Sequence, residues 1–212
     1  VDEEGGKVTR IADNENFDVP SFPNISEIGS GQKTNWAYEL GDSIGTYLSR
    51  MGFNLDFAPV ADVLSNPENT VVKQRSYGSD AQKVSQMVQE NLKGLQQHQV
   101  FGCIKHFPGH GATQGDTHDG YAYTDKTWEE LADNDIIPFE DSIAWGVEFV
   151  MVGHISLPEV TGDDVPASLS PFVIGNLLRA KLGYEGIVLT DALNMGAVTD
   201  QYTSAQAAVK AI

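Results

Sequence analysis

The sequence predicts an α/β fold built around a parallel β-sheet. Four short apolar runs, rich in β-branched or aromatic residues, have the character of strands: residues 53–58, 100–105, 149–152 and 186–190. Longer amphipathic stretches separate them, and strands that alternate with helices are typical of a parallel sheet. Most of the runs lack strict alternation of apolar and polar residues, as expected of strands covered on both faces.

Helical patterns fill the intervals between the strands. Apolar residues recur every three or four positions over 36–51 and 84–92, which predicts two amphipathic helices, the second with Ser79 or Asp80 as its N-cap. A capping box at Thr127–Glu130 and the Ser170–Pro171 pair indicate two further helix starts, and Gly183 indicates where the second of these helices ends. Residues 203–212 also have the pattern of a helix.

Polar residues gather just beyond the predicted strands, at Asp62, Lys105, His106, His154 and Asp191. A barrel enzyme builds its site from the carboxyl ends of several strands, whereas an open sheet concentrates its ligand groups at one crevice. The pattern therefore favours a TIM-type (β/α)8 barrel. Because the sequence has neither a Gly-x-Gly-x-x-Gly motif nor a Walker loop, a nucleotide-binding fold loses its main support.

The length predicts that the barrel is incomplete. A full barrel takes about 250 residues, and this chain has 212, with four clear strands and the tail of a further one ending at Val1. We therefore expect one barrel domain over 1–212, of about four to five β/α units, which is short of a full barrel. Unpaired strand edges lead us to expect self-association or exchange of elements with a second copy.

Charge excludes several classes of protein. With 13 Lys and Arg against 30 Asp and Glu, the net charge is −17, which disfavours binding to nucleic acid or to an anionic membrane surface. A single cysteine cannot form an internal disulfide. No apolar run is long enough to span a membrane, and no signal segment opens the chain, so localisation stays open between the cytoplasm and the cell envelope.

Three of the five histidines lie in the segment 105–119, for which three interpretations are open. It could be a polar loop with scattered histidines, or a metal site. The third interpretation is a histidine acid/base: in Asp116-Thr117-His118 the two outer side chains fall on the same side of an extended loop. A carboxylate bonded to one imidazole nitrogen fixes the tautomer and leaves the other nitrogen to exchange a proton.

The metal interpretation is weakened by the spacing of the histidines. His106 and His110 are four residues apart, but Pro108 and Gly109 lie between them and prevent a helical clamp. A metal-dependent hydrolase on the same barrel would use His106, His110, His118 and His154.

Asp191 follows an apolar strand and is a candidate nucleophile towards an electrophilic carbon. The structural alternative is an N-cap for the next helix. Asp62 also follows a strand and could bind hydroxyl groups. Arg75, in Gln-Arg-Ser-Tyr-Gly, could equally form a surface ion pair of little energetic value.

The motifs together resemble the catalytic domain of family-3 glycoside hydrolases, in the β-N-acetylglucosaminidase branch. The matching segments run in family order over essentially the whole chain: Val1–Arg10, Asn54–Asp62, Arg75–Gly78, Lys105–Gly111, Asp116–His118, Leu177–Lys181 and Gly186–Gly196. The resemblance implies that Asp191 is the nucleophile, that His118 is the acid/base and that Asp116 is its partner. It implies sugar-binding roles for these residues: Asp62, Arg75, Lys105, His106 and, more weakly, His154.

The implied activity is a retaining β-N-acetylhexosaminidase that removes terminal N-acetylglucosamine from bacterial peptidoglycan fragments, without a cofactor or metal. The β-glucosidase branch of the family lacks the Asp-x-His loop, so this loop favours an N-acetylhexosamine substrate. A phosphorylase, an enzyme for another β-glycoside and an inactive carbohydrate-binding remnant are the alternatives. The resemblance also implies that residues 1–212 are a single catalytic barrel domain without the first and last strands of the full barrel. Whether this chain is active by itself stays open.

Overall fold

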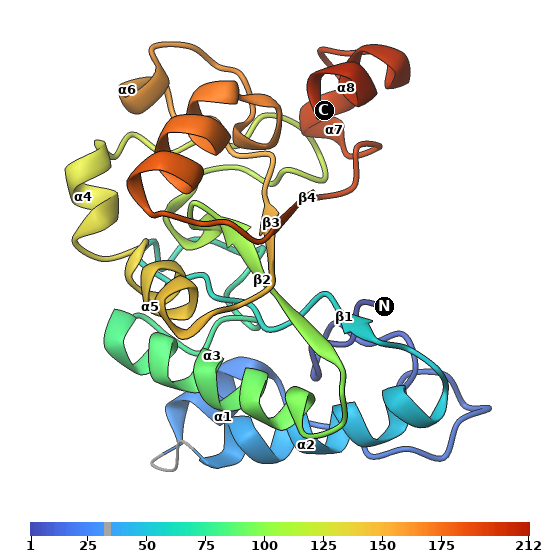
Figure 1. Cartoon of the computed structure of the whole chain (residues 1–212). Helices are drawn as coiled ribbons and strands as arrows, with labels where there is room; N and C mark the ends of the chain where they lie inside the picture. Colours follow the sequence, from blue (N-terminus) through green and yellow to red (C-terminus); the bar gives the residue numbers. More distant parts are fainter. Residues whose placement is uncertain (32–34) are drawn as a thin grey trace.

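The computed structural model describes residues 1–31 and 35–212, which form a four-stranded parallel sheet with helices packed against it (Figure 1). The strands are β1 (Leu55–Asp56), β2 (Phe101–Phe107), β3 (Phe149–Val152) and β4 (Ile187–Thr190). They lie side by side in the order of the sequence, and every neighbouring pair is parallel. In a doubly wound sheet the order of the strands reverses at a switch point, and in this sheet it does not. The order agrees with the predicted barrel architecture.

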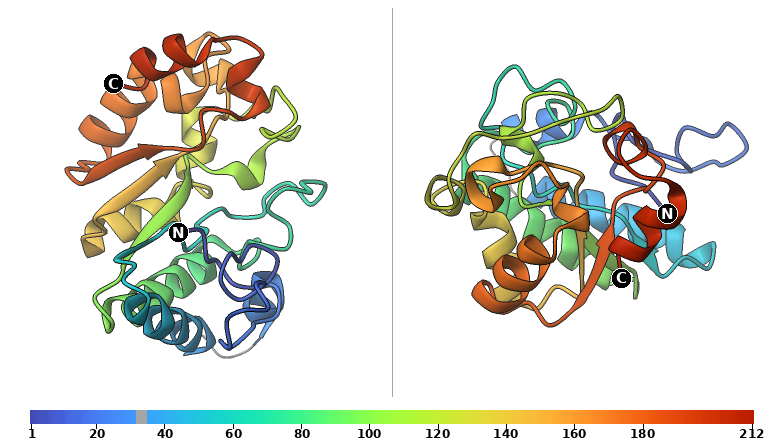
Figure 2. Two further views of the ribbon diagram at one scale, coloured as in Figure 1. Left: turned by 90° about the vertical axis from the view of Figure 1, so that its right-hand side faces the viewer. Right: turned by 90° about the horizontal axis from the view of Figure 1, so that it is seen from above.

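Helices connect the strands in the expected alternation. The helices before β1 are α1 (Ile25–Ser30) and α2 (Asn35–Arg50), and α3 (Ala81–Gln96) joins β1 to β2. The later elements are α4 (Trp128–Ala132), α5 (Ile137–Trp145), α6 (Pro158–Thr161), the π-helix η3 (Phe172–Lys181), α7 (Gly196–Thr199) and α8 (Ser204–Lys210), with 3-10 turns η1 (His110–Ala112) and η2 (Ala167–Leu169). Helix α3 packs against α2, α5 and β2, so these helices form one outer layer (Figures 1 and 2).

Local signals place most of the helix ends. The Asp80 side chain accepts a hydrogen bond from the Lys83 backbone N–H at 3.1 Å, which makes it the N-cap of α3. The capping box at Thr127 is present at the start of α4. A second capping box, which starts at Thr203, opens α8. These contacts satisfy N–H groups that the first helical turn leaves without partners.

The helix predicted after Ser170 differs in form from the expectation. It begins at Phe172 with Pro171 as its cap, and it has π geometry instead of the expected α geometry. The Ser170 hydroxyl still accepts a bond from the Val173 N–H at 3.4 Å. Gly183, with φ of +69°, follows directly after the last turn and allows the chain to leave the helix.

The core lies between the sheet and the outer helices. Phe107, at the end of β2, is fully buried and meets Phe139 of α5 edge to face, with ring centroids 5.4 Å apart. Leu40 and Leu92, one from each of two neighbouring helices, are buried in the same cluster. This packing fixes the outer layer and leaves the carboxyl ends of the strands to build a site.

The two edges of the sheet differ. Beside β1, the Val1 ammonium donates to the Leu55 carbonyl at 3.0 Å, and the Val1 carbonyl accepts from the Phe57 N–H at 2.7 Å, so Val1 lies against this edge. At the other edge, among the described residues, β4 pairs with β3 alone. Ile187 in β4 is 52% exposed. Apolar surface thus remains uncovered at this edge.

No helix in the described part of the chain combines the length and the apolar character needed to cross a membrane.

Candidate active site

A cavity of about 580 Å³ lies at the carboxyl ends of the strands. Its lining includes six of the eight residues that the sequence singled out: Arg75, Lys105, His106, Asp116, His118 and Asp191. The N-terminal segment adds charged residues that the sequence reasoning did not assign: Asp2, Lys7 and Arg10. Residues far apart in the sequence therefore meet in one cavity at the end of the sheet where barrel enzymes hold their sites.

Asp191 directly follows β4 and lines this cavity. Its backbone N–H donates to the Val152 carbonyl at 3.0 Å, and its carboxylate accepts from the Ala192 N–H at 2.7 Å. Burial opposes ionisation, but the nearby His106 and the Ala192 N–H lower the pKa of Asp191 below its ordinary value. The next helix has Met195 as its N-cap, so the N-cap interpretation of Asp191 is wrong. The carboxylate is free to face a ligand.

His118 and Asp116 form the predicted pair. The His118 Nδ1 lies 2.8 Å from the Asp116 Oδ1, which also accepts from the His118 backbone N–H at 2.9 Å. Partial burial opposes ionisation of Asp116, but these two contacts lower its pKa. With Nδ1 bound to the carboxylate, Nε2 is the nitrogen left for proton exchange, and the His118 side chain is 59% exposed.

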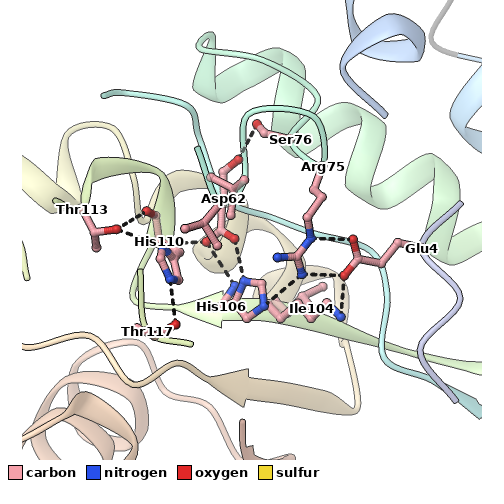
Figure 3. Close-up of polar contacts among 12 residues, drawn as sticks. Glu4, Asp62, Arg75, Ser76, Ile104, His106, His110, Thr113 and Thr117 are labelled. Carbon is pink, nitrogen blue, oxygen red and sulfur yellow. Dashed lines mark hydrogen bonds and ion pairs between the residues drawn. The ribbon is translucent and has the colours of Figure 1, made fainter. Parts of the chain in front are cut away.

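Arg75, Lys105 and Glu4 form a buried ion network at the cavity wall, and Figure 3 shows its Arg75–Glu4 pair. The Glu4 carboxylate accepts from Arg75 Nε at 2.8 Å and from Arg75 Nη2 at 2.6 Å, and it lies 2.7 Å from Lys105 Nζ. Lys105 also donates to Asp2 at 2.7 Å. Burial alone would raise the pKa of Glu4, yet the two cations lower it to about 2. The ion pair of Arg75 is therefore buried, and the interpretation of Arg75 as part of a surface ion pair is wrong.

Asp62 acts on the cavity through His106. The Asp62 carboxylate is fully buried; its Oδ2 lies 2.7 Å from His106 Nδ1, and its Oδ1 accepts from the backbone N–H groups of His106 and His110 at 3.1 and 2.6 Å (Figure 3). Burial opposes its ionisation, but His106 and His110 lower the pKa of Asp62. Asp62 does not line the cavity, so it orients the His106 ring, whose Nε2 lies 3.4 Å from Arg75 Nη2.

His154 is placed behind the cavity wall. It is 1% exposed; its Nδ1 lies 2.6 Å from the Ser168 hydroxyl, and its Nε2 lies 2.9 Å from the Ala192 carbonyl. Burial lowers the pKa of His154, which favours the neutral ring. An Nε2–H donor to Ala192 then leaves Nδ1 to accept from Ser168. This placement supports a role in holding the backbone after Asp191, in contrast to the implied sugar contact.

The candidate metal ligands do not converge. Within 1–31 and 35–212, no three His, Cys, Asp or Glu side chains come close enough together to hold a metal ion. His106 is occupied by Asp62, His154 by Ser168 and Ala192, and both ring nitrogens of His110 by threonine hydroxyls. The geometry gives the metal-hydrolase alternative no centre in these residues.

The sequence reasoning missed the acidic side of the ion network. Asp2 and Glu4 are two residues apart in an extended segment, so their side chains share one face. Buried cations need such partners, because an unpaired buried charge is costly. Asp2 and Glu4 could have been predicted as partners of Arg75 and Lys105 if these two cations had been expected to be buried.

Glu3 points to the opposite side and shapes the loop. Its carboxylate accepts from the backbone N–H groups of Arg10, Ile11 and Ala12 at 2.6 to 3.0 Å, and from the Tyr47 hydroxyl at 2.8 Å. These bonds close the turn that brings the segment 7–10 to the cavity.

Known proteins resemble this chain over its whole length. A solved glycoside hydrolase family 3 beta-N-acetylglucosaminidase from Paenibacillus sp. str. FPU-7 is 40% identical, with a TM-score of 0.94 over 99% of this chain and 39% of that one. Beta-hexosaminidase LpqI of Mycobacterium tuberculosis is 34% identical over 100% of this chain and 55% of its own length. Beta-hexosaminidase A of Pseudoalteromonas piscicida is 32% identical over 99% and 37%.

The chain spans about half the length of the curated relatives that it matches, between 37% and 63% for these and similar proteins. The family model described as the glycosyl hydrolase family 3 N terminal domain matches residues 1–212. The match covers every segment that builds the cavity, from Asp2 to Asp191. This chain therefore belongs to glycosyl hydrolase family 3, as its N-terminal domain.

Proposed function

We propose that the chain provides the active site of a retaining β-N-acetylhexosaminidase. The observation that carries the proposal is the cavity at the strand ends, where an ionised Asp191 and a carboxylate-bound His118 face the same space beside Arg75 and Lys105. Similarity to proteins named beta-hexosaminidase and beta-N-acetylglucosaminidase supports the substrate class.

The proposed reaction has two displacements at the anomeric carbon. In the first, an Asp191 carboxylate oxygen attacks that carbon while the bond to the leaving oxygen breaks, and protonated His118 gives its Nε2 proton to the leaving oxygen. In the second, neutral His118 takes a proton from water, the water oxygen attacks the same carbon, and the bond to Asp191 breaks. Asp116 holds Nδ1 throughout and stabilises the imidazolium.

The remaining cavity residues suit an uncharged terminal sugar such as N-acetylglucosamine. Arg75 and Lys105 supply N–H groups for sugar hydroxyls, and His106, whose Nδ1 is bound to Asp62, offers Nε2 as an acceptor. Glu4 and Asp62 hold these side chains in place, because they bind them from the buried side. Peptidoglycan fragments are the proposed natural source of the sugar.

The central test is hydrolysis of an aryl N-acetylglucosaminide. Asp191→Asn should abolish turnover, since the amide is not a nucleophile, and Asp119→Asn is the matched control because that exposed side chain lies in the same loop as the dyad. Near-normal rates in Asp191→Asn would refute the nucleophile assignment. Because the relatives are about twice as long, the assay is run on this chain alone and on the same domain within a longer natural polypeptide.

His118→Ala tests the acid role separately. A good leaving group needs little protonation, so the variant should slow the first step much less for a nitrophenyl glycoside than for an alkyl glycoside, by a difference of about 10²–10⁴-fold. Equal losses on both substrates would contradict the acid role. Two additions to the assay test the alternatives. With added phosphate, a sugar-1-phosphate product would indicate a phosphorylase. With an added chelator, loss of activity would indicate a metal-dependent hydrolase.

We also propose that the uncovered apolar side near β4 is buried by a second copy of the chain. Ile187 in this edge strand is 52% exposed, and large apolar side chains left exposed on an unpaired sheet edge favour association. Light scattering should show a dimer or larger species that Ile187→Lys dissociates. A monodisperse monomer for the unchanged chain would refute this proposal.

A further inference from the structure

We propose that Thr117 and Gly196 are positioning residues that hold the acid/base pair against the segment following the nucleophile. The inference rests on the proposed roles of His118 and Asp191. It concerns how these two groups, carried by different loops, are kept at a fixed separation.

Thr117 is the buried residue of an otherwise exposed loop. It is 1% exposed, whereas the side chains of its neighbours Asp116 and His118 are 34% and 59% exposed. The Thr117 hydroxyl lies 3.2 Å from the His110 Nε2 (Figure 3). The dyad residues therefore project to the cavity from either side of a side chain that anchors the loop to the buried cluster around Asp62.

The surrounding hydrogen bonds assign the direction of this contact. The Thr113 hydroxyl donates to the His110 carbonyl at 2.8 Å, so its oxygen is left to accept from His110 Nδ1–H at 2.9 Å. Burial lowers the pKa of His110 to about 4, so the ring is neutral and carries one N–H. His110 Nε2 is then an acceptor, and the Thr117 hydroxyl donates to it.

The main chain of the same loop is docked on the other side. The Ala197 N–H donates to the Thr117 carbonyl at 3.1 Å, and the Gly196 N–H donates to the His118 carbonyl at 3.2 Å. Both donors lie five or six residues after Asp191 on the same connection from β4. The loop that bears the proton donor thus rests directly on the segment that bears the nucleophile.

Gly196 is required by the closeness of this contact. A Cβ atom at position 196 would lie 2.8 to 2.9 Å from three main-chain atoms of the loop: the Asp119 carbonyl carbon, the Gly120 nitrogen and the His118 oxygen. Main-chain atoms cannot turn aside as a side chain can, so the loop would have to move away. A displacement of about 1 Å at a catalytic group costs up to about 10²-fold in rate.

The test compares matched variants. Thr117→Val keeps the shape of the side chain but removes the hydroxyl, and Thr117→Ser keeps the hydroxyl. Gly196→Ala is paired with Gly175→Ala, because a Cβ at position 175 meets nothing within 4 Å. Each protein is assayed with an alkyl and a nitrophenyl N-acetylglucosaminide, and backbone amide exchange at positions 196 and 197 is followed by NMR.

Thr117→Val should lose about tenfold in kcat/KM on the alkyl substrate, the size of one neutral hydrogen bond, and little on the nitrophenyl substrate. Gly196→Ala should lose about 10²-fold with the same dependence on leaving group. Thr117→Ser and Gly175→Ala should retain the unchanged rates. Equal losses on both substrates would indicate general destabilisation and would overturn the positioning role.

The exchange measurement separates this inference from the proposed function. The amides at 196 and 197 should exchange faster in Thr117→Val and keep their protection in Thr117→Ser, whether or not the chain hydrolyses glycosides. Unchanged exchange in Thr117→Val would overturn the docking model. Faster exchange together with absent hydrolysis would leave the docking in place and count against the enzymatic assignment alone.

Discussion

Replacing Glu4 by glutamine removes the negative charge that joins Arg75 to Lys105. The Glu4 carboxylate is buried, makes three contacts of 2.6 to 2.8 Å with the two cations and has its pKa lowered from 4.5 to about 2. Each tenfold change in an ionisation constant corresponds to about 1.4 kcal/mol. The ionised carboxylate therefore contributes about 3 kcal/mol to the free energy of unfolding at neutral pH, similar to the cost of breaking a buried ion pair.

The pH dependence gives the sign of the effect. Because the pKa is lower in the folded state than in the unfolded state, the contribution is fully present above about pH 4.5 and is lost as the pH falls towards 2. Urea unfolding from pH 7 down to pH 3 should show Glu4→Gln less stable by about 3 kcal/mol at pH 7, with a smaller difference at pH 3. Glu68→Gln, at an exposed position, is the control. A difference that does not change with pH would refute the reasoning.

Two further predictions concern packing around the site. Gly111→Ala should destabilise the protein by about 1–3 kcal/mol in thermal unfolding, because the new Cβ would collide with the Val63 carbonyl oxygen; an unchanged transition would show that the loop yields freely. Tyr47→Phe should cost about 1.5–3 kcal/mol in urea unfolding, because the hydroxyl donates to the buried Glu3 carboxylate at 2.8 Å; a neutral result would mean that water replaces it.

The strands and the amphipathic helices could be predicted from the sequence because period and capping are local signals. Asp80 and Thr127 are caps that depend on their own next three residues. The strand predicted over 53–58 is regular only at Leu55–Asp56, although pairing with the next strand continues irregularly, with Cys103 N–H bonded to the Ala58 carbonyl at 2.8 Å. Such irregular pairing depends on the partner strand, which local periodicity does not describe.

The positions of the site residues could be predicted better than their contacts. Asp191 and His118 line the cavity as expected, because strand ends and loops are readable along the chain. Asp62 and His154 are chemically similar candidates at equivalent strand ends, yet both side chains are buried behind the cavity wall. Which side of a wall a side chain faces is decided by tertiary packing, since His154 meets Ser168 and Ala192 only in the folded chain.

The buried ion network has a consequence for how the protein responds to salt. Contacts between charges excluded from water are weakly screened, so Arg75 and Lys105 stay held by Glu4 at ionic strengths that abolish surface attractions. A neutral glycoside also feels no long-range field, and the net charge of −17 neither guides it to the cavity nor repels it. If the proposed substrate class is right, capture of such a ligand is governed by short-range fit and stays nearly constant from dilute buffer to high salt.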